Sequence, residues 1–250
     1  ELTSVYSQRG RPLFKVCYTE VMLIIGHRGA GGLAPENSMA AMQAGFEACV
    51  DMLEFDVRLT KDQIPVVIHD ARLMRTHHIR ESIAHLSLAD LQSLTRRQPI
   101  PTLQEVLDVY FGKILLNIEL KSRGSGQVVM ALLEHRYIKK SKDWDNVIIS
   151  SFKGIELINM RRRSQKVNLA MLHNENPFIF VAYHRFIQFT AVGFHRLYLN
   201  RFALEIAKKA GLFTYAYTVN RPAALPLLEK QGIDGIVTNY PDKFRDWMGQ

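Results

Sequence analysis

Residues 53–70 read LEFDVRLTKDQIPVVIHD, which is two apolar runs on either side of a polar break. Side chains alternate faces along a strand, so Glu54 and Asp56 point to the same side of the first run. The polar break predicts a tight hairpin turn. If the turn is centred on Asp62, the numbers of paired residues sum to about 124, and this antiparallel register places His69 beside both carboxylates.

Two further strands are predicted to end in polar groups of the same kind. The strand 114–121 is apolar and carries Glu119 and Lys121 on one face at its end, and the strand 22–26 runs into a His-Arg pair at 27–28. Polar side chains at the carboxyl ends of successive strands build the active site of a β/α barrel. The sequence therefore predicts an α/β fold, a TIM (β/α)8 barrel with a β-hairpin extension after strand 2 and a short insertion before strand 3.

The carboxylates of these strands, Glu54, Asp56 and Glu119, predict a metal site. Buried carboxylates on one face repel each other unless a positive group lies between them, and the simplest such group is a divalent cation. Oxygen ligands suit Mg²⁺ or Ca²⁺, whereas Zn²⁺ prefers cysteine or histidine. We therefore expect one divalent cation, Mg²⁺ or Ca²⁺.

Strands and helices alternate along the rest of the chain, as a parallel sheet covered by helices requires. The 250 residues and the hydrophobic content of 47% suit one barrel domain, which we place at 22–250. Residues 1–21 are left as an N-terminal extension of uncertain role, either a segment upstream of a natural start at Met22 or a short strand or plug over the barrel bottom. The eight barrel strands are expected at 22–26, 52–57, 114–119, 146–150, 167–171, 189–194, 212–217 and 233–237, with 65–69 as the hairpin return.

Helices are expected after these strands, and several residue types mark their ends. Asn37 or Ser38 can cap the first helix, Pro222 stands at the start of the seventh, and Ser87 can cap an additional helix at 87–94 in the insertion. The expected helices are 37–49, 102–110, 126–138, 153–163, 176–185, 200–210, 221–230 and 241–247.

The composition restricts the compartment and the partners. Cys17 and Cys49 show no metal-type spacing, and neither a signal-peptide layout nor an apolar window of ~18 residues occurs. We expect a cytoplasmic protein without stable membrane insertion. The net charge of +8 favours an anionic substrate or membrane surface. Basic runs such as 161–163 are interpreted as solvated helix ends, so we expect no nucleic-acid partner; the oligomeric state stays open.

Nine short motifs occur in order along the chain: HRGA (27–30), APENS (34–38), EFDV (54–57), LTKD (59–62), PVVIHD (65–70), IELK (118–121), SSF (150–152), YTVN (217–220) and GIDGIVTNYP (232–241). Each motif alone is weak evidence. Together, in order and spacing, they resemble the glycerophosphodiester phosphodiesterase family, and the resemblance runs from about residue 22 to the C-terminus.

The catalytic candidates are His27 and His69, because an imidazole titrates near neutrality and can both accept and donate a proton. Arg28 and Lys121 are candidates for binding the substrate phosphate, the first as a fork and the second as a point charge. Both cations are also expected to pair with the carboxylates when no phosphate is bound.

Four further residues are candidates for a wall or loop of the site: Glu36, Phe152, Tyr217 and Asn220. Glu36 is expected either to touch the metal or substrate or to fix the first loop. The family usually has Trp where Tyr217 stands, so an aromatic wall is kept, with simple packing as the alternative. The stretch 75–80 (RTHHIR) departs from the Thr/Gly-containing segment usual in the family and leaves the leaving-group preference open.

The resemblance implies metal-dependent hydrolysis of small-molecule glycerophosphodiesters to sn-glycerol 3-phosphate and an alcohol, in glycerophospholipid and glycerol metabolism. The expected route is attack on phosphorus by the neighbouring glycerol hydroxyl, followed by opening of a cyclic phosphate by water; direct attack by water is the alternative. A lysophospholipase D-like or cyclic-phosphate-forming enzyme acting on lipids is a second possibility, with an apolar entrance at 177–189. A catalytically silent barrel is a third.

Overall fold

The computed structural model describes residues 3–6, 12–16 and 22–248 of the chain. The expected barrel strands all form, and each begins and ends within two residues of its predicted position. They are β3 (Leu23–Gly26), β4 (Met52–Leu59), β6 (Leu115–Leu120), β7 (Val147–Ser151), β8 (Asn168–Leu172), β9 (Ala191–His195), β10 (Phe213–Tyr217) and β11 (Gly235–Thr238).

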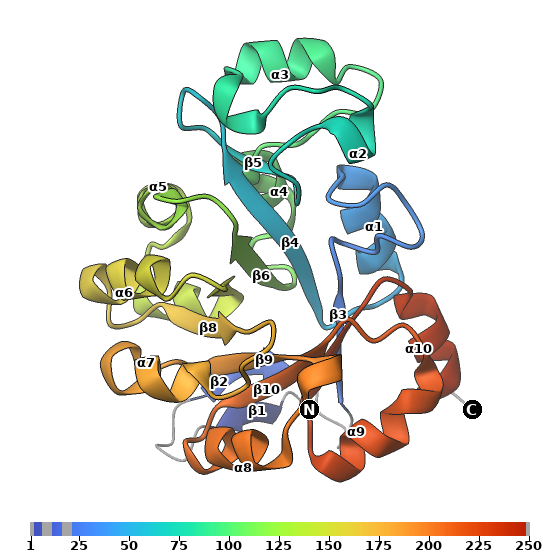
Figure 1. Cartoon of the computed structure of the whole chain (residues 1–250), viewed down its shortest axis with the longest axis vertical. Coiled ribbons are helices and arrows are strands. Elements are labelled where there is room, and N and C mark those ends of the chain that lie inside the picture. The colour runs from blue at the N-terminus through green and yellow to red at the C-terminus, as the bar shows by residue number, and fades with distance from the viewer. Residues whose placement is uncertain (1–2, 7–11, 17–21, 249–250) are drawn as a thin grey trace.

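These eight strands run parallel and close into a ring. Neighbours follow the order β3-β11-β10-β9-β8-β7-β6-β4, and β3 pairs back onto β4. Helices surround the ring (Figure 1), so the chain is a TIM (β/α)8 barrel, as predicted. The helices of the barrel are α1 (Met39–Glu47), α4 (Leu103–Tyr110), α5 (Ser125–Leu132), α6 (Gly154–Arg163), α7 (Ile179–Ile187), α8 (Arg201–Lys209), α9 (Leu225–Gln231) and α10 (Pro241–Met248).

Three helices differ from their predicted bounds by three or more residues at one end. The helix expected at 126–138 changes into a π-helical turn, η2 (Leu133–Tyr137), and the one expected at 221–230 begins as a 3₁₀ turn, η5 (Pro222–Ala224). The helix expected at 176–185 begins later, because the Asn176 side chain accepts a hydrogen bond from the Phe178 N–H and holds a turn there. Among the described residues, no helix has both the length and the apolar character needed to cross a bilayer.

The hairpin extension has the predicted register. In β5 (Pro65–Val67), Val67 pairs with Val57 and Val66 with Arg58, so each pair sums to 124. The insertion that follows contains α2 (Met74–His77), η1 (Ile83–His85) and α3 (Leu88–Leu94), the last capped by the Ser87 side chain as expected. It packs on the hairpin through a small core of its own, formed by Val66, Ile68, Leu73, Ile83, Leu91 and Ile100.

Inside the barrel, the inward side chains change from apolar to polar along β3 and β4. Leu23 and Ile25 of β3 are followed at the same spacing by His27, and Met52 of β4 is followed by Glu54. The polar groups therefore collect at the carboxyl ends of the strands, where β/α barrels carry their active sites.

One residue of the basic run 161–163 contradicts its interpretation as a solvated helix end. Arg161 is buried, and its guanidinium donates to backbone carbonyls of Ser164, Val167, Ile187 and Gln188. A guanidinium can satisfy several carbonyls at once, so this one arginine serves four carbonyls near the end of α6.

Part of the N-terminal extension forms an antiparallel pair, β1 (Thr3–Tyr6) with β2 (Pro12–Val16). Strand β2 lies beside the 3₁₀ turn η3 (Ser141–Asn146) that leads into β7. The role of the extension and its separation from the domain at 22–250 stay predictions, and Cys17 lies outside the described residues.

Candidate active site

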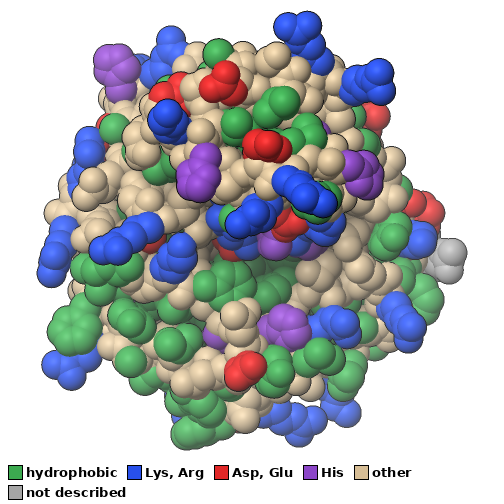
Figure 2. Space-filling view, turned by 45° about the horizontal axis from the view of Figure 1, so that its top comes forward, with side chains coloured by type: hydrophobic (Ala, Val, Ile, Leu, Met, Phe, Trp, Pro, Cys, Tyr) green, Lys and Arg blue, Asp and Glu red, His purple; other side chains and the backbone are tan. Residues whose placement is uncertain are grey.

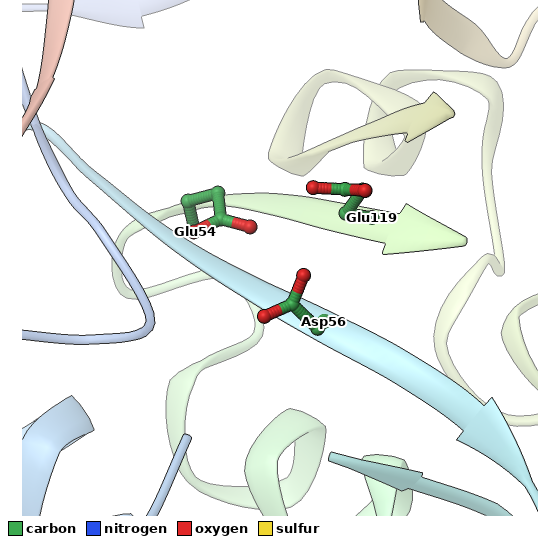
Figure 3. Close-up of side chains that lie close together, drawn as sticks. All are labelled: Glu54, Asp56 and Glu119. Carbon is green, nitrogen blue, oxygen red and sulfur yellow. The ribbon is translucent and has the colours of Figure 1, made fainter. Parts of the chain in front are cut away.

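Three buried carboxylates meet at the carboxyl ends of two neighbouring strands (Figure 3). Glu54 and Asp56 extend from β4, and Glu119 extends from β6 at the position paired with Asp56. The side chains of these residues offer ligand oxygens that all lie within 4.8 Å of one another. Their exposed fractions are 5%, 1% and 8%, so water screens their charges little.

Burial and mutual repulsion set the pKa values of the three acids. Burial, together with Asp56 and Glu119, raises the pKa of Glu54 well above its usual range. Burial and the Asp56 charge raise the pKa of Glu119 to about 7. Burial also opposes ionisation of Asp56, but Lys121 and Arg28 outweigh it and lower its pKa to about 2. Two of the three acids thus lack enough positive charge around them to ionise readily.

The donor set fits a divalent cation such as Mg²⁺ or Ca²⁺. Glu54 Oε1 is buried and has no hydrogen-bond partner among the described residues. A cavity of about 30 Å³ lies against Glu54 and Glu119, with Asn117, Ser150 and Tyr215 also among its lining residues. An unsatisfied buried carboxylate oxygen in an all-oxygen cluster is what a hard cation would complete.

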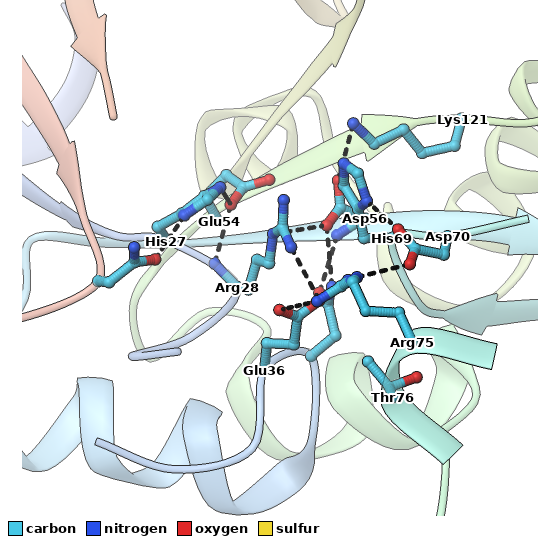
Figure 4. Close-up of polar contacts among 12 residues, drawn as sticks. His27, Arg28, Glu36, Glu54, Asp56, His69, Asp70, Arg75, Thr76 and Lys121 are labelled. Atoms are coloured by element: carbon cyan, nitrogen blue, oxygen red, sulfur yellow. Dashed lines mark hydrogen bonds and ion pairs between the residues drawn. The ribbon is translucent and has the colours of Figure 1, made fainter. Parts of the chain in front are cut away.

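The two candidate histidines lie on either side of this cluster (Figure 4). His27 follows β3; its Nδ1 lies 2.6 Å from Asn239 Oδ1, and its Nε2 lies 3.9 Å from Glu54 Oε2. Burial, aided by the Arg28 charge, lowers the pKa of His27 to about 4. His69 follows the hairpin return, where burial lowers its pKa although Asp56 acts in the opposite direction.

A tight turn after β3 presents Arg28 to the carboxylates. Arg28 has a left-handed φ of 54° and is followed by Gly29 with φ of 84°. The Arg28 N–H donates to Glu54 Oε2 at 2.9 Å, while its guanidinium Nε lies 3.5 Å from Asp56 Oδ2. Gly29 allows the turn to lie against α1, since an added Cβ would come within 2.5 Å of the Ala41 backbone.

Lys121 is the second cation of the site. Its ammonium group lies 3.1 Å from Asp56 Oδ1 and is also ion-paired with Glu119. Lys121 and Arg28 therefore pair with the carboxylates, which was one of the two states expected for them. Lys121 also lies over the ring of Phe152, with its Nζ 5.4 Å from the ring centre.

The four wall candidates divide into two kinds. Phe152 and Tyr217 pack edge to face with ring centres 6.1 Å apart, and they extend the site toward β10. The Tyr217 hydroxyl donates to the backbone carbonyl of His173. Asn220 accepts from the Asn239 N–H at 2.9 Å, so it supports the loop whose Asn239 side chain holds His27.

Glu36 is held within an ion-pair network. Its carboxylate accepts from Arg28 Nη1 at 2.8 Å and from Arg75 Nη2 at 2.5 Å. Burial opposes its ionisation, but the arginines outweigh this effect and lower the pKa of Glu36. These contacts hold Glu36 between Arg28 and Arg75, and the choice between its two expected roles stays a prediction.

Several residues of the site were not expected from the sequence. Asn37 does not cap α1; Ser38 does, and Asn37 instead donates to Asp56 Oδ2 at 2.8 Å and accepts from the Asp56 N–H. Asp70 and Arg75 join the site beside His69. Position within the APENS and PVVIHD motifs was the available signal for Asn37 and Asp70, whereas Arg75 lies in the stretch that departs from the family pattern.

Buried acids, histidines and cations that converge at the strand ends of a β/α barrel define an enzyme site for an anionic substrate. Comparison with known proteins narrows this class. The sequence profile described as the Glycerophosphoryl diester phosphodiesterase family matches residues 27–243. The chain belongs to this family, and it is therefore an enzyme of the phosphoric diester hydrolase class.

Relatives cover nearly the whole barrel. A glycerophosphodiester phosphodiesterase of Caldanaerobacter subterraneus is 32% identical over 235 residues, which are 88% of this chain and 95% of that protein. YhdW of Bacillus subtilis is 35% identical over 235 residues, 88% of this chain and 96% of its own. A phosphodiesterase of Oleispira antarctica, solved with the product sn-glycerol-3-phosphate, superposes with a TM-score of 0.80 at 25% identity, covering 91% of this chain and 97% of that one.

Proposed function

We propose that this protein hydrolyses glycerophosphodiesters to sn-glycerol 3-phosphate and an alcohol, in a metal-dependent reaction with histidine acid/base catalysis. The observation that carries the proposal is the convergence of Glu54, Asp56 and Glu119 with two histidines and two cations. The presence of sn-glycerol-3-phosphate in the related Oleispira structure supports the product.

In the proposed reaction, Arg28 and Lys121 exchange carboxylate contacts for phosphoryl oxygens of the substrate. Both cations now contact Asp56, so a phosphate bound beside this carboxylate could interact with the two of them together. These contacts strengthen as negative charge grows on phosphorus and its oxygens, which is the condition for lowering the barrier.

His27 and His69 are the proposed proton carriers. One takes a proton from the attacking hydroxyl, which is the glycerol hydroxyl next to the ester or a water, and the other gives a proton to the departing alcohol. With the glycerol hydroxyl as nucleophile, the ester bond to the alcohol breaks as a cyclic phosphate forms, and water then opens the ring. Burial lowers the pKa values of both histidines, which favours the neutral imidazole that can accept a proton.

Glu54, Asp56 and Glu119 would hold the divalent cation, Mg²⁺ or Ca²⁺. When bound, such an ion acts as a Lewis acid that offsets charge on phosphoryl oxygens and favours ionisation of the attacking hydroxyl.

The test is release of sn-glycerol 3-phosphate from glycerophosphodiesters with choline, ethanolamine or glycerol as head group, in EDTA, Mg²⁺ and Ca²⁺. Release that depends on Mg²⁺ or Ca²⁺ is the expected result. Equal release in EDTA would overturn metal dependence, and release from none of the diesters under any condition would overturn the proposed substrate class.

A second candidate function is activity on lipid phosphodiesters such as lysophospholipids. It is favoured by exposed apolar side chains at the end of the barrel that carries the site. Leu197 and Phe202, in and just after the loop that follows β9, are 67% and 64% exposed. Figure 2 shows hydrophobic side chains gathered over the lower left part of one face. Within the stretch 177–189, in contrast, Phe180 and Ile187 are buried in the core, and this part of the expected entrance is filled by packing. Including lysophospholipids in the same panel tests this candidate.

We propose a cytoplasmic location on the basis of cysteine usage: Cys49 is a free and exposed thiol, which reducing conditions preserve. Proteolysis of intact and permeabilised cells would distinguish a cytoplasmic protein from an exported one. The absence of nucleic-acid partners stays a prediction.

A further inference from the structure

We infer that Arg75 is a positioning residue that holds His69 and Arg28 in their working orientations from opposite ends of one guanidinium. This inference rests on the proposed function, because it assigns a role within the same site. Arg75 comes from α2 in the insertion, outside the barrel strands.

The contacts of Arg75 use three nitrogens and reach two carboxylates. Its Nε donates to Asp70 Oδ2 at 2.6 Å, its Nη1 to Glu36 Oε2 at 2.9 Å and its Nη2 to Glu36 Oε1 at 2.5 Å. Both oxygens of Glu36 are thus gripped by the fork, and the remaining edge reaches Asp70. A planar guanidinium fixes the relative position of two carboxylates in a way that a lysine ammonium cannot.

Each of the two carboxylates in turn contacts a residue of the site, Asp70 contacting His69 and Glu36 contacting Arg28. Asp70 Oδ1 lies 2.6 Å from His69 Nδ1, and this contact fixes the plane of the imidazole. Glu36 Oε1 accepts from Arg28 Nη1 at 2.8 Å, and Arg28 in turn reaches Asp56. Figure 4 shows Arg75 between Glu36 and Asp70, so one side chain joins a proposed proton carrier to a proposed phosphate ligand.

The place of Arg75 in the fold indicates a role in orientation more than in stability. Leu73, two residues earlier, is fully buried in the small core of the insertion and anchors this segment, whereas the Arg75 side chain is about half exposed. Ion pairs at such exposure contribute little to the free energy of unfolding. Loss of the guanidinium should therefore loosen the site without unfolding the insertion.

The experiment compares Arg75→Ala with Arg80→Ala, an exposed arginine of the same segment outside this network, on the diester that the wild type hydrolyses best. We expect Arg75→Ala to lower kcat by about 10- to 100-fold, with a smaller change in KM and a melting temperature close to that of the wild type. Arg80→Ala should keep the wild-type kcat. Arg75→Lys, which keeps the charge and loses the fork, should restore less than half of the lost activity.

Variants of the two carboxylates that Arg75 contacts test the inference even if Arg75→Ala does not fold. Asp70→Asn weakens the contact of Arg75 with Asp70, and Glu36→Gln weakens its contact with Glu36. When either is combined with Arg75→Ala, the fold-loss in kcat should be smaller than the product of the two separate fold-losses, because the residues act as one unit. Equal kcat for Arg75→Ala and Arg80→Ala, or full activity in Arg75→Lys, would overturn the inference alone. An inactive wild type would overturn the proposed function together with it.

Discussion

At the scale of single residues, the two histidines of the site are held by different acceptors. His27 Nδ1 faces the amide oxygen of Asn239, and His69 Nδ1 faces the carboxylate of Asp70. In each case the acceptor favours a proton on Nδ1, which leaves Nε2 for proton exchange. The carboxylate stabilises a charged imidazole more than an amide does, so the two histidines are suited to different steps.

The histidines should affect turnover and leave metal binding nearly unchanged. We expect His27→Ala and His69→Ala each to lower kcat by ~10²–10⁴-fold, because each removes a proton carrier. Neither histidine belongs to the acidic cluster, so Mg²⁺ or Ca²⁺ affinity measured by calorimetry should change little. The exposed His135 provides a control for substitution elsewhere. A variant with near-normal kcat would remove that histidine from the mechanism.

The raised pKa of Glu119 predicts a pH effect on the metal-free protein. A group with a folded-state pKa of about 7, against 4.5 when unfolded, stabilises the fold fully below pH 4.5 and loses this contribution as the pH rises to about 7. Glu119→Gln removes the titration. In EDTA, the melting temperature of Glu119→Gln should therefore rise relative to that of the wild type between pH 5 and pH 7.

The histidines with lowered pKa values titrate in both proteins, so the difference between the two melting curves reports Glu119 together with Glu54, whose pKa the Glu119 charge helps to raise. A constant difference across this pH range would show that Glu119 ionises normally in the metal-free fold.

At the scale of elements, the turn between β3 and α1 depends on backbone conformation. Gly29 and Gly124 both have positive φ values, of 84° and 79°, but only Gly29 lies against another backbone. We expect Gly124→Ala to cost about 1–2 kcal/mol, the usual cost of a left-handed alanine. Gly29→Ala adds a steric clash, for an expected total of about 2–5 kcal/mol, and it should displace Arg28. Denaturant unfolding of both variants measures whether Gly29→Ala loses more free energy of unfolding than Gly124→Ala.

Arg161 and Arg162 are neighbours on α6, and we expect their substitution to change the free energy of unfolding by different amounts. Arg161→Ala leaves the backbone carbonyls of Val167 and Ile187 without this donor, which should lower the free energy of unfolding by about 2–3 kcal/mol. Arg162 is an exposed neighbour on the same helix, and Arg162→Ala should change it by less than about 0.5 kcal/mol. Equal losses in urea unfolding would contradict the anchoring role of Arg161.

Local pattern predicted the elements well, because the strands of this barrel are short apolar runs bounded by polar groups. The period of two also placed Glu54 with Asp56, and the turn at Asp62 fixed the hairpin register. Pattern could not predict partners that only the closed ring brings together, such as Asn239 with His27, which are 212 residues apart. Nor could it separate Arg161 from its neighbours, because burial of one arginine in a basic run depends on the tertiary fold.

At the scale of the whole molecule, the site spans one of the two shortest strand pairings of the ring, the other being β10 with β11. Strands β3 and β4 pair only through Ile25 with Met52 and Gly26 with Leu53, whereas β4 and β6 pair along six positions. The Arg28 N–H to Glu54 contact lies above the β3–β4 pairing and links its two sides. Whatever binds the carboxylates thus acts close to the point where the barrel closes.

Metal removal should therefore lower the stability of the entire domain. An ion present at a hundred times its Kd stabilises the fold by about 2.7 kcal/mol, which corresponds to roughly 5–10 °C in melting temperature for a chain of this size. Thermal unfolding in Mg²⁺, Ca²⁺ and EDTA measures this shift. Glu54→Gln should abolish most of it, and a shift of wild-type size in that variant would remove Glu54 from the cation site.

The separate core of the insertion has a consequence for divergence and for engineering. Since Leu73, Ile83 and their neighbours pack together on Val66 and Ile68 of the hairpin, residues 71–101 resemble a cassette that a related barrel with the same hairpin could exchange without rebuilding its other strands. The exchange is constrained at one position, where the cassette carries a guanidinium bonded to two barrel-side carboxylates. A chimaera with a foreign cassette would thus fold readily and still work poorly until an arginine is restored at that position.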